Sequence, residues 1–292
     1  MKIDDFGNIS FRQSWLDTAN RCPNAGRLAA LYPDDNVPSY PTALGTAAHA
    51  GMEARLTGIS NPNDIHDIIG ETLDTELAIP GIKQVKYEGG RPELLRRAIH
   101  CYNEWATHLY PKLPEGVPEV HFDLPVFTMP DGRTVSITGT IDFVPYEGNL
   151  LWDWKCPGRT YSAKEKQNWA IQPTIYTMAA VMGGLKHATD WEYEWPMSFG
   201  YGIMVTQVKK AKLQTFTVTR QRGHASWAMS MMYDWVVMYD KMGFGDPWPK
   251  NESTFLCTST WCDSWDRCKG AHQDWKDNIT PVEFKDYPYN QG

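Results

Sequence analysis

Two apolar segments joined by a short turn constrain the fold of this chain more than any other feature. Residues 141–146 and 150–156 are extended runs, and the Glu-Gly-Asn triplet at 147–149 has the composition of a tight turn. The two runs are therefore predicted to pair as an antiparallel hairpin. The charged residues within them are Asp142, Asp153 and Lys155. A charge within an apolar strand requires a partner or a function.

Hydrophobic periodicity predicts the elements around this hairpin. Apolar residues recur at helical spacing before residue 110, and alternate with polar ones near 120–124 and 134–138. We expect helices over 11–22, 44–56, 92–109, 164–182 and 225–242, and later strands over 199–207 and 213–219. This order predicts an α/β fold, a central mixed β-sheet flanked by helices. We expect one domain over 1–270, followed by a polar tail over 271–292.

Charge and composition restrict the class of protein. The net charge of -7 argues against a protein that coats nucleic acid through bulk electrostatics. It argues less against an enzyme whose carboxylates bind cations. The amino terminus carries acids where a secretory signal carries bases, and no apolar run approaches the ~20 residues that span a bilayer. We therefore expect a cytoplasmic protein with no membrane partner, in which clustered cysteines are metal ligands or buried thiols.

The hairpin brings two carboxylates and an amine together. Asp142 and Asp153 can approach each other across it, and Lys155 lies on the same strand face as Asp153 because side chains repeat every second residue. Convergent carboxylates bind Mg²⁺ or Mn²⁺, and a neighbouring lysine can orient or deprotonate the attacking water. The alternative is that Asp142 ends a strand and that Asp153 and Lys155 are an exposed charge pair.

Two helices carry further polar pairs at a spacing of four residues. His49 and Glu53 share a face of the predicted 44–56 helix, either in a cleft or on the surface. Gln172 and Tyr176 share a face of the predicted 164–182 helix. Pro173 favours a helix that begins close to it. Glu119 is interpreted as a strand-end charge rather than as a further acid of the site.

Four motifs together resemble those of one nuclease family. They are G-T-A-A-H at 45–49, G-T-I-D-F-V at 139–144, L-L-W-D-W-K at 150–155 and Q-P-T-I-Y at 172–176. They are similar to motifs of the RecB-like branch of PD-(D/E)XK nucleases, which includes CRISPR-associated RecB-like exonucleases and many phage recombination nucleases. The resemblance covers roughly residues 10–270. It implies a restriction-endonuclease-like core and metal-dependent DNA cleavage, with exonuclease action favoured, in recombination, repair or phage DNA processing within the host cytoplasm.

The resemblance also implies a role for each motif residue. The metal ligands would be His49, Asp142, Asp153 and the backbone carbonyl of Trp154. Lys155 would be catalytic, with Gln172 and Tyr176 lining the cleft and positioning substrate or the lysine. DNA would be the substrate, and a recombination protein is a further candidate partner.

Four cysteines form a second group. Cys22 lies near the amino terminus, and Cys257, Cys262 and Cys268 form a C-x4-C-x5-C pattern near the carboxyl end. Similar enzymes bind a 4Fe-4S cluster with one early and three late cysteines, usually ending C-x2-C-x5-C. The longer first gap keeps structural Zn²⁺ and free buried thiols open as alternatives. Bound metal would join the two ends of the chain as a cysteine-bound module.

Two other functions remain compatible with the sequence. One is a catalytically inert DNA-binding or recombination accessory protein that keeps the fold. The other is a zinc-stapled adaptor for protein interactions, which the acidic charge favours. Retention of both aspartates and the lysine argues for the nuclease.

Overall fold

Seven strands form one mixed sheet in the computed structural model, which describes residues 1–35, 37–83, 89–207, 213–253, 257–258 and 262–268. The order is β1-β2-β4-β5-β6-β7, and β3 pairs with β4. The strands are β1 (Lys2–Ile3), β2 (Ile9–Arg12), β3 (Gly116–Thr128), β4 (Thr134–Pro145), β5 (Leu150–Lys155), β6 (Met197–Met204) and β7 (Leu213–Arg220). The predicted tail over 271–292 lies outside the described residues.

The long strand β4 organises the sheet. β3 runs antiparallel along its whole length, from the Gly116↔Pro145 pair to the Thr128↔Thr134 pair. Since a strand has two edges, β2 and β5 must share the other one. β2 pairs in parallel with residues 135–138, and β5 pairs antiparallel through Phe143↔Trp152. The predicted hairpin is therefore confirmed, but β4 and β5 are paired over a short stretch. Residues 139–142 of β4 lie between the stretch that pairs with β2 and the stretch that pairs with β5.

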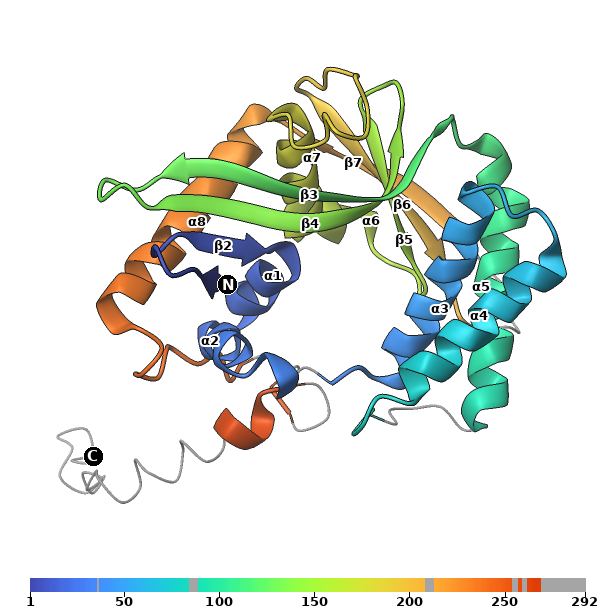
Figure 1. Cartoon of the computed structure of the whole chain (residues 1–292), viewed down its shortest axis with the longest axis horizontal. Coiled ribbons are helices and arrows are strands. Elements are labelled where there is room, and N and C mark those ends of the chain that lie inside the picture. Colours follow the sequence, from blue (N-terminus) through green and yellow to red (C-terminus); the bar gives the residue numbers. More distant parts are fainter. Residues whose placement is uncertain (36, 84–88, 208–212, 254–256, 259–261, 269–292) are drawn as a thin grey trace, which may run out of the picture.

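Helices flank this sheet. They are α1 (Gln13–Arg21), α2 (Pro23–Leu31), α3 (Tyr40–Leu56), α4 (Pro62–Leu77), α5 (Gly90–His108), α6 (Ala163–Trp169), α7 (Ile171–Val181) and α8 (Arg222–Met242), with short 3-10 turns η1 (Pro33–Asp35) and η2 (Tyr110–Lys112). Figure 1 shows α3, α4 and α5 grouped at one end of the molecule and α1 and α2 towards the other. None of the helices in the described ranges is long and apolar enough to cross a membrane.

The predicted helix over 164–182 is wrong in one respect, because it breaks at Ala170 into α6 and α7. Ala170 is extended, with φ -75° and ψ 123°. Pro173 explains the break, since within a continuous helix its ring would clash with the carbonyl four residues earlier. At the third position of α7 its missing N–H costs nothing. The Arg220 side chain also donates to the carbonyls of Lys166 and Ala170 at the break.

Two hydrophobic cores cover the sheet. The larger combines strand residues such as Ile137 and Phe199 with residues of α1, α7 and α8. The second combines α3, α4 and α5 with three strand residues, Phe143, Trp154 and Met204. The strand face of Trp154 is therefore covered by the helices of the second core. This packing brings α3 against the β4/β5 region, where the charged residues of the hairpin lie.

Candidate active site

Asp142 and Asp153 both lie where β4 and β5 diverge. The carboxylate of Asp142 accepts a 2.6 Å hydrogen bond from the Trp154 backbone N–H. Asp153 is 1% exposed, and its Oδ1 accepts bonds from Lys155 Nζ at 2.8 Å and Gln172 Nε2 at 2.7 Å. Its buried Oδ2 has no hydrogen-bond donor among the described residues. A buried carboxylate oxygen without a donor is costly unless a cation binds it.

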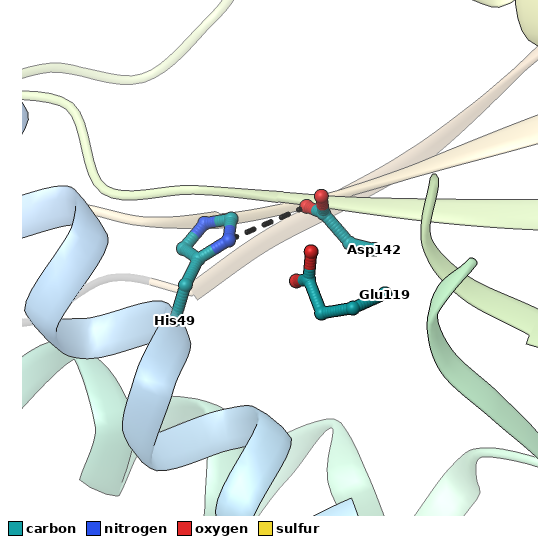
Figure 2. Close-up of side chains that lie close together, drawn as sticks. All are labelled: His49, Glu119 and Asp142. Carbon is teal, nitrogen blue, oxygen red and sulfur yellow. Dashed lines mark ion pairs between the residues drawn. The ribbon is translucent and has the colours of Figure 1, made fainter. Parts of the chain in front are cut away.

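Helix α3 brings His49 to the same place. Its Nε2 lies 3.0 Å from the Trp154 carbonyl, and its Nδ1 lies 3.7 Å from Asp142 Oδ2 (Figure 2). Because a carbonyl only accepts, Nε2 carries the proton and donates, which leaves the Nδ1 lone pair facing Asp142. Burial, followed by the charge of Lys155, lowers the pKa of His49 to about 4. The imidazole is therefore neutral near pH 7, the form that binds metals.

Glu119 completes the cluster, which corrects its interpretation as a strand-end charge. It lies inside β3, and the flanking pairs Pro118↔Phe143 and Val120↔Ile141 put it opposite Asp142. One donor atom each from His49, Glu119 and Asp142 lie within 4.8 Å of one another, and Figure 2 shows the three side chains converging. The sequence signal was weak, because only the register of β3 on β4 brings the two acids together.

The geometry at Glu119 is unfavourable without a cation. Its backbone φ is +49°, a conformation that side-chain-bearing residues rarely adopt and that costs of order 1 kcal/mol or more. Burial, then the charges of Asp142, Glu53 and Asp153, raises the pKa of Glu119 to about 8. Like charges directly opposite each other on neighbouring strands are destabilising. Strain and repulsion at one position are typical of a functional site.

Lys155 is held as a cation. Burial by itself lowers the pKa of Lys155, but Asp153 and Asp142 outweigh it and raise the pKa above its ordinary value. Its side chain is 33% exposed, so the ammonium stays within reach of a ligand. A lysine that keeps its proton can orient water and offset negative charge, but it cannot accept a proton. This favours the orienting role over the deprotonating one.

The remaining predicted residues, Gln172, Tyr176 and Glu53, differ in burial and in their contact with the site. Gln172 reaches Asp153 directly. Tyr176, four residues on, is 5% exposed and packs between Phe122 and Phe199, with ring centroids at 5.7 and 5.8 Å. Glu53 is exposed on α3, and no hydrogen bond between it and His49 is present in the described part of the chain. Gln172 is thus a polar contact of the site, whereas Tyr176 is a buried residue that packs the same helix against the strands.

The donors present suit a divalent cation. They comprise one neutral imidazole, the carboxylates of Glu119 and Asp142, the unpartnered Asp153 oxygen and the nearby Trp154 carbonyl. Oxygen-rich sets with one imidazole fit Mg²⁺ or Mn²⁺ better than soft metals, which prefer thiolates. His49, Glu119 and Asp142 form one cluster, which adds Glu119 to the ligands expected from the motifs, and Asp153 lies beside that cluster rather than within it.

The four cysteines line a second pocket, of about 250 Å³. Cys22 lies between α1 and α2, while Cys257, Cys262 and Cys268 follow α8. Two N–H groups lie 3.5 Å from sulfur atoms, the Asn251 backbone from Cys22 and the Asn24 amide from Cys268. Within the described residues, no three cysteine sulfurs lie within 4.8 Å of one another. Sulfurs around one tetrahedral zinc lie about 3.8 Å apart, given a Zn–S bond of about 2.3 Å.

Backbone contacts join the two chain ends beside this pocket. The backbone N–H of Asn24 donates to the Pro249 carbonyl, and the side-chain amide of Asn251 donates to the Arg21 carbonyl. Figure 1 shows the segment after α8 returning towards α1 and α2. The other two cysteines lie elsewhere: Cys101 is buried in the second core, and Cys156 packs against that core. Both are therefore packing residues of the second core rather than part of the cysteine pocket.

Comparison with known proteins gives a family match and a fold match. Residues 11–269 match the family model of the PD-(D/E)XK nuclease superfamily. A crystal structure from Eubacterium rectale, described as that of a candidate exonuclease, aligns with a TM-score of 0.51 and 13% identity over 100% of this chain and 99% of that one. At this identity the likeness concerns the fold alone. The structure of SSO0001 aligns with a TM-score of 0.39 and 10% identity, over 92% of this chain and 89% of that one. No curated protein sequence matches the chain.

Proposed function

The chain belongs to the PD-(D/E)XK nuclease superfamily, and from this premise we propose that it is a divalent-metal-dependent deoxyribonuclease of the RecB-like branch, with exonuclease action favoured. One observation supports this most directly. The buried carboxylate of Asp153 has one oxygen held by Lys155 and Gln172 and the other without a donor among the described residues. That arrangement suits a cation on one side of Asp153 and a catalytic ammonium on the other.

The proposed metal ligands are His49, Glu119, Asp142 and Asp153, with the Trp154 carbonyl nearby. Bound Mg²⁺ or Mn²⁺ would polarise a phosphoryl oxygen and lower the pKa of water. The Trp154 peptide organises two of these side chains, because its N–H binds Asp142 and its carbonyl binds His49. A ligand set fixed in this way loses little entropy when a cation binds.

Lys155 and Gln172 act on the other side of Asp153. The Lys155 ammonium orients the attacking water and offsets negative charge that develops at phosphorus. Since Lys155 stays protonated, the proton of that water leaves to a carboxylate of the site or to solvent. Gln172 donates to Asp153 Oδ1 and thereby fixes the carboxylate that aims the lysine. Tyr176 supports the helix that carries Gln172 through its packing on Phe122 and Phe199.

We propose that residues 1–270 form one nuclease domain, whose two ends are joined by a 4Fe-4S cluster on Cys22, Cys257, Cys262 and Cys268, with Zn²⁺ as the alternative. The cysteines share a pocket, and two N–H donors approach their sulfurs. The cluster would stabilise the chain ends rather than take part in hydrolysis. The proposed setting is recombination, repair or phage DNA processing in the cytoplasm, where thiols stay reduced.

A cleavage assay tests the proposed activity. End-labelled single- and double-stranded DNA is incubated with the full-length protein and Mg²⁺, Mn²⁺ or EDTA. We expect cleavage with either cation, none in EDTA, and end-dependent loss of label if the enzyme is an exonuclease. Lack of cleavage of both substrates with both cations would overturn the proposal and favour the inert accessory protein. Closed circular DNA provides a matched substrate without ends, and its cleavage would identify an endonuclease.

A further inference from the structure

Helix α6 lies beside the candidate active site and carries features that the site described so far does not use. It ends at Trp169, three residues before Gln172, whose side chain binds Asp153. Lys166 and Trp169 are three residues apart, and residues at this spacing are neighbours on a helix surface. Trp169 is 80% exposed, more than any other tryptophan among the described residues. Exposure of so large an apolar ring is unfavourable unless a ligand covers it.

The cation of Lys166 is held by aromatic rings. Its Nζ lies 4.4 Å from the ring centroid of Tyr161 and 5.4 Å from that of Tyr201. No carboxylate of the described residues forms a salt bridge with it. Cation–π contacts hold the ammonium in place, while the carboxylates of Asp153, Asp17 and Glu165 act on its charge from beyond ion-pair distance. Lys166 therefore offers a fixed positive charge next to a site where a phosphodiester must bind.

Several hydrogen bonds make α6 a rigid support. The Gln167 side chain donates to the Thr219 carbonyl at 3.1 Å and accepts from the Thr219 N–H at 3.0 Å. The buried Arg220 guanidinium donates to the carbonyls of Lys166 at 3.1 Å and Ala170 at 3.0 Å. These contacts hold α6 against β7. Trp169 is thus carried on an anchored helix rather than on a loose loop.

Charge is distributed unevenly across the site. His49, Glu119 and Asp142 form the side that would hold cations, while Lys155 and Lys166 provide positive charge on the other. Both Lys155 and Asp153 interact electrostatically with Lys166, so the two lysines belong to one electrostatic environment. A polyanionic strand that enters this acidic protein would meet its positive charge at α6.

We propose that α6 is the ledge that binds the substrate strand, with Lys166 contacting a backbone phosphate beside the scissile one and Trp169 stacking on an unpaired base. This inference rests on the proposed function and deepens it. Stacking needs an exposed base face, so the substrate class is single-stranded DNA or an unpaired strand end.

Binding measurements on the full-length protein test the ledge. The probes are a fluorescein-labelled twelve-nucleotide thymidylate strand and a blunt twelve-base-pair duplex, with EDTA present to prevent cleavage. We expect Trp169→Ala to weaken single-strand binding by about 5- to 100-fold and to leave duplex binding unchanged. Lys166→Gln should weaken single-strand binding and reduce the salt dependence by about one phosphate contact.

The chain offers a matched control for each variant. Trp227 is an exposed tryptophan on α8, and Lys164 is an exposed lysine on α6 itself. Trp227→Ala and Lys164→Gln should both bind like the unmodified protein. Three outcomes would each overturn the ledge and leave the nuclease assignment intact. Each variant and its control could weaken binding equally, the variants could lose equal affinity for strand and duplex, or they could bind normally while the unmodified protein also binds. An unmodified protein that binds neither probe and cleaves no DNA would overturn both.

Discussion

The two candidate metal centres of this chain are built in opposite ways. In the active site the side chains come from strands and helices of the cores, and hydrogen bonds to the Trp154 peptide, Lys155 and Gln172 hold them without a cation. In the cysteine pocket the thiols come from the two ends of the chain, and the first and second are 235 positions apart (257 minus 22). The polypeptide fold organises the first centre, whereas at the second it brings the two chain segments together and bound metal would tie the four thiols to one another.

The largest expected effect is loss of catalysis without loss of structure. Asp153→Ala and Lys155→Ala should each lower turnover on the order of 10³-fold, since they remove a proposed ligand or the water-orienting ammonium. Both variants should stay folded, because the two hydrophobic cores do not depend on these side chains, but loss of one partner of the buried Asp153–Lys155 pair should lower the melting temperature. Turnover and circular dichroism on the same preparations check both statements, with the exposed Asp67→Ala as control. Undiminished turnover in either variant would contradict the assignment.

Cys22→Ser tests the other side of the comparison and should act on stability. Loss of one thiolate should release the metal and lower the free energy of unfolding by about 3 kcal/mol or more, since the metal closes a very long loop. Fresh anaerobic protein should contain iron and sulfide and be brown, or contain about one zinc and be colourless. EDTA treatment that empties the active site alone should change the melting temperature little. A metal-free protein with unchanged melting in the variant would remove the distinction between the two centres.

His49→Ala sharpens the description of the first centre. Loss of one proposed ligand from an otherwise fixed set should raise the Mn²⁺ concentration for half-maximal rate by about 10- to 100-fold. Titration of the rate with Mn²⁺ measures this shift. Glu71→Gln, which removes an exposed carboxylate of α4, is the control and should leave the titration close to that of the unmodified enzyme. An unshifted Mn²⁺ titration for His49→Ala would show that His49 is an ordinary surface residue and not a metal ligand.

The smallest effect concerns Glu119 in the metal-free protein. Its folded-state pKa of about 8 exceeds the ordinary value, so ionisation costs stability progressively as pH rises from about 4.5 to 8. Glu119→Gln should therefore raise the free energy of unfolding in EDTA by about 1 to 2 kcal/mol at pH 8, with little difference at pH 4. Denaturant unfolding at both pH values measures this. Saturating Mn²⁺ should reverse the sign, because only the carboxylate binds the cation; a variant less stable in EDTA at pH 8 would argue against repulsion at this position.

Local patterns predicted the parts of the molecule that depend on local chemistry. The hairpin, its turn and the Asp153–Lys155 pair follow from alternation along two short runs. Glu119 was misjudged because cross-strand register decides its neighbour, and no pattern within β3 encodes that register. The break at Ala170 depends partly on Arg220, which lies 50 residues away. The helix expected over 11–22 begins at Gln13 instead, because residues 11 and 12 belong to β2, whose pairing with β4 overrides the local preference.

The second core has a consequence for the order in which the molecule assembles. Helices α3, α4 and α5 are consecutive in the chain, so their mutual contacts close short loops and can form early. The sheet instead needs Ile9 to pair with Val135, 126 residues away (135 minus 9), which is slow. His49 therefore arrives at the carboxylates only when a preassembled helical unit docks on the sheet. Metal bound across that junction would couple the two units, and amide exchange in α3 should slow when Mn²⁺ is added.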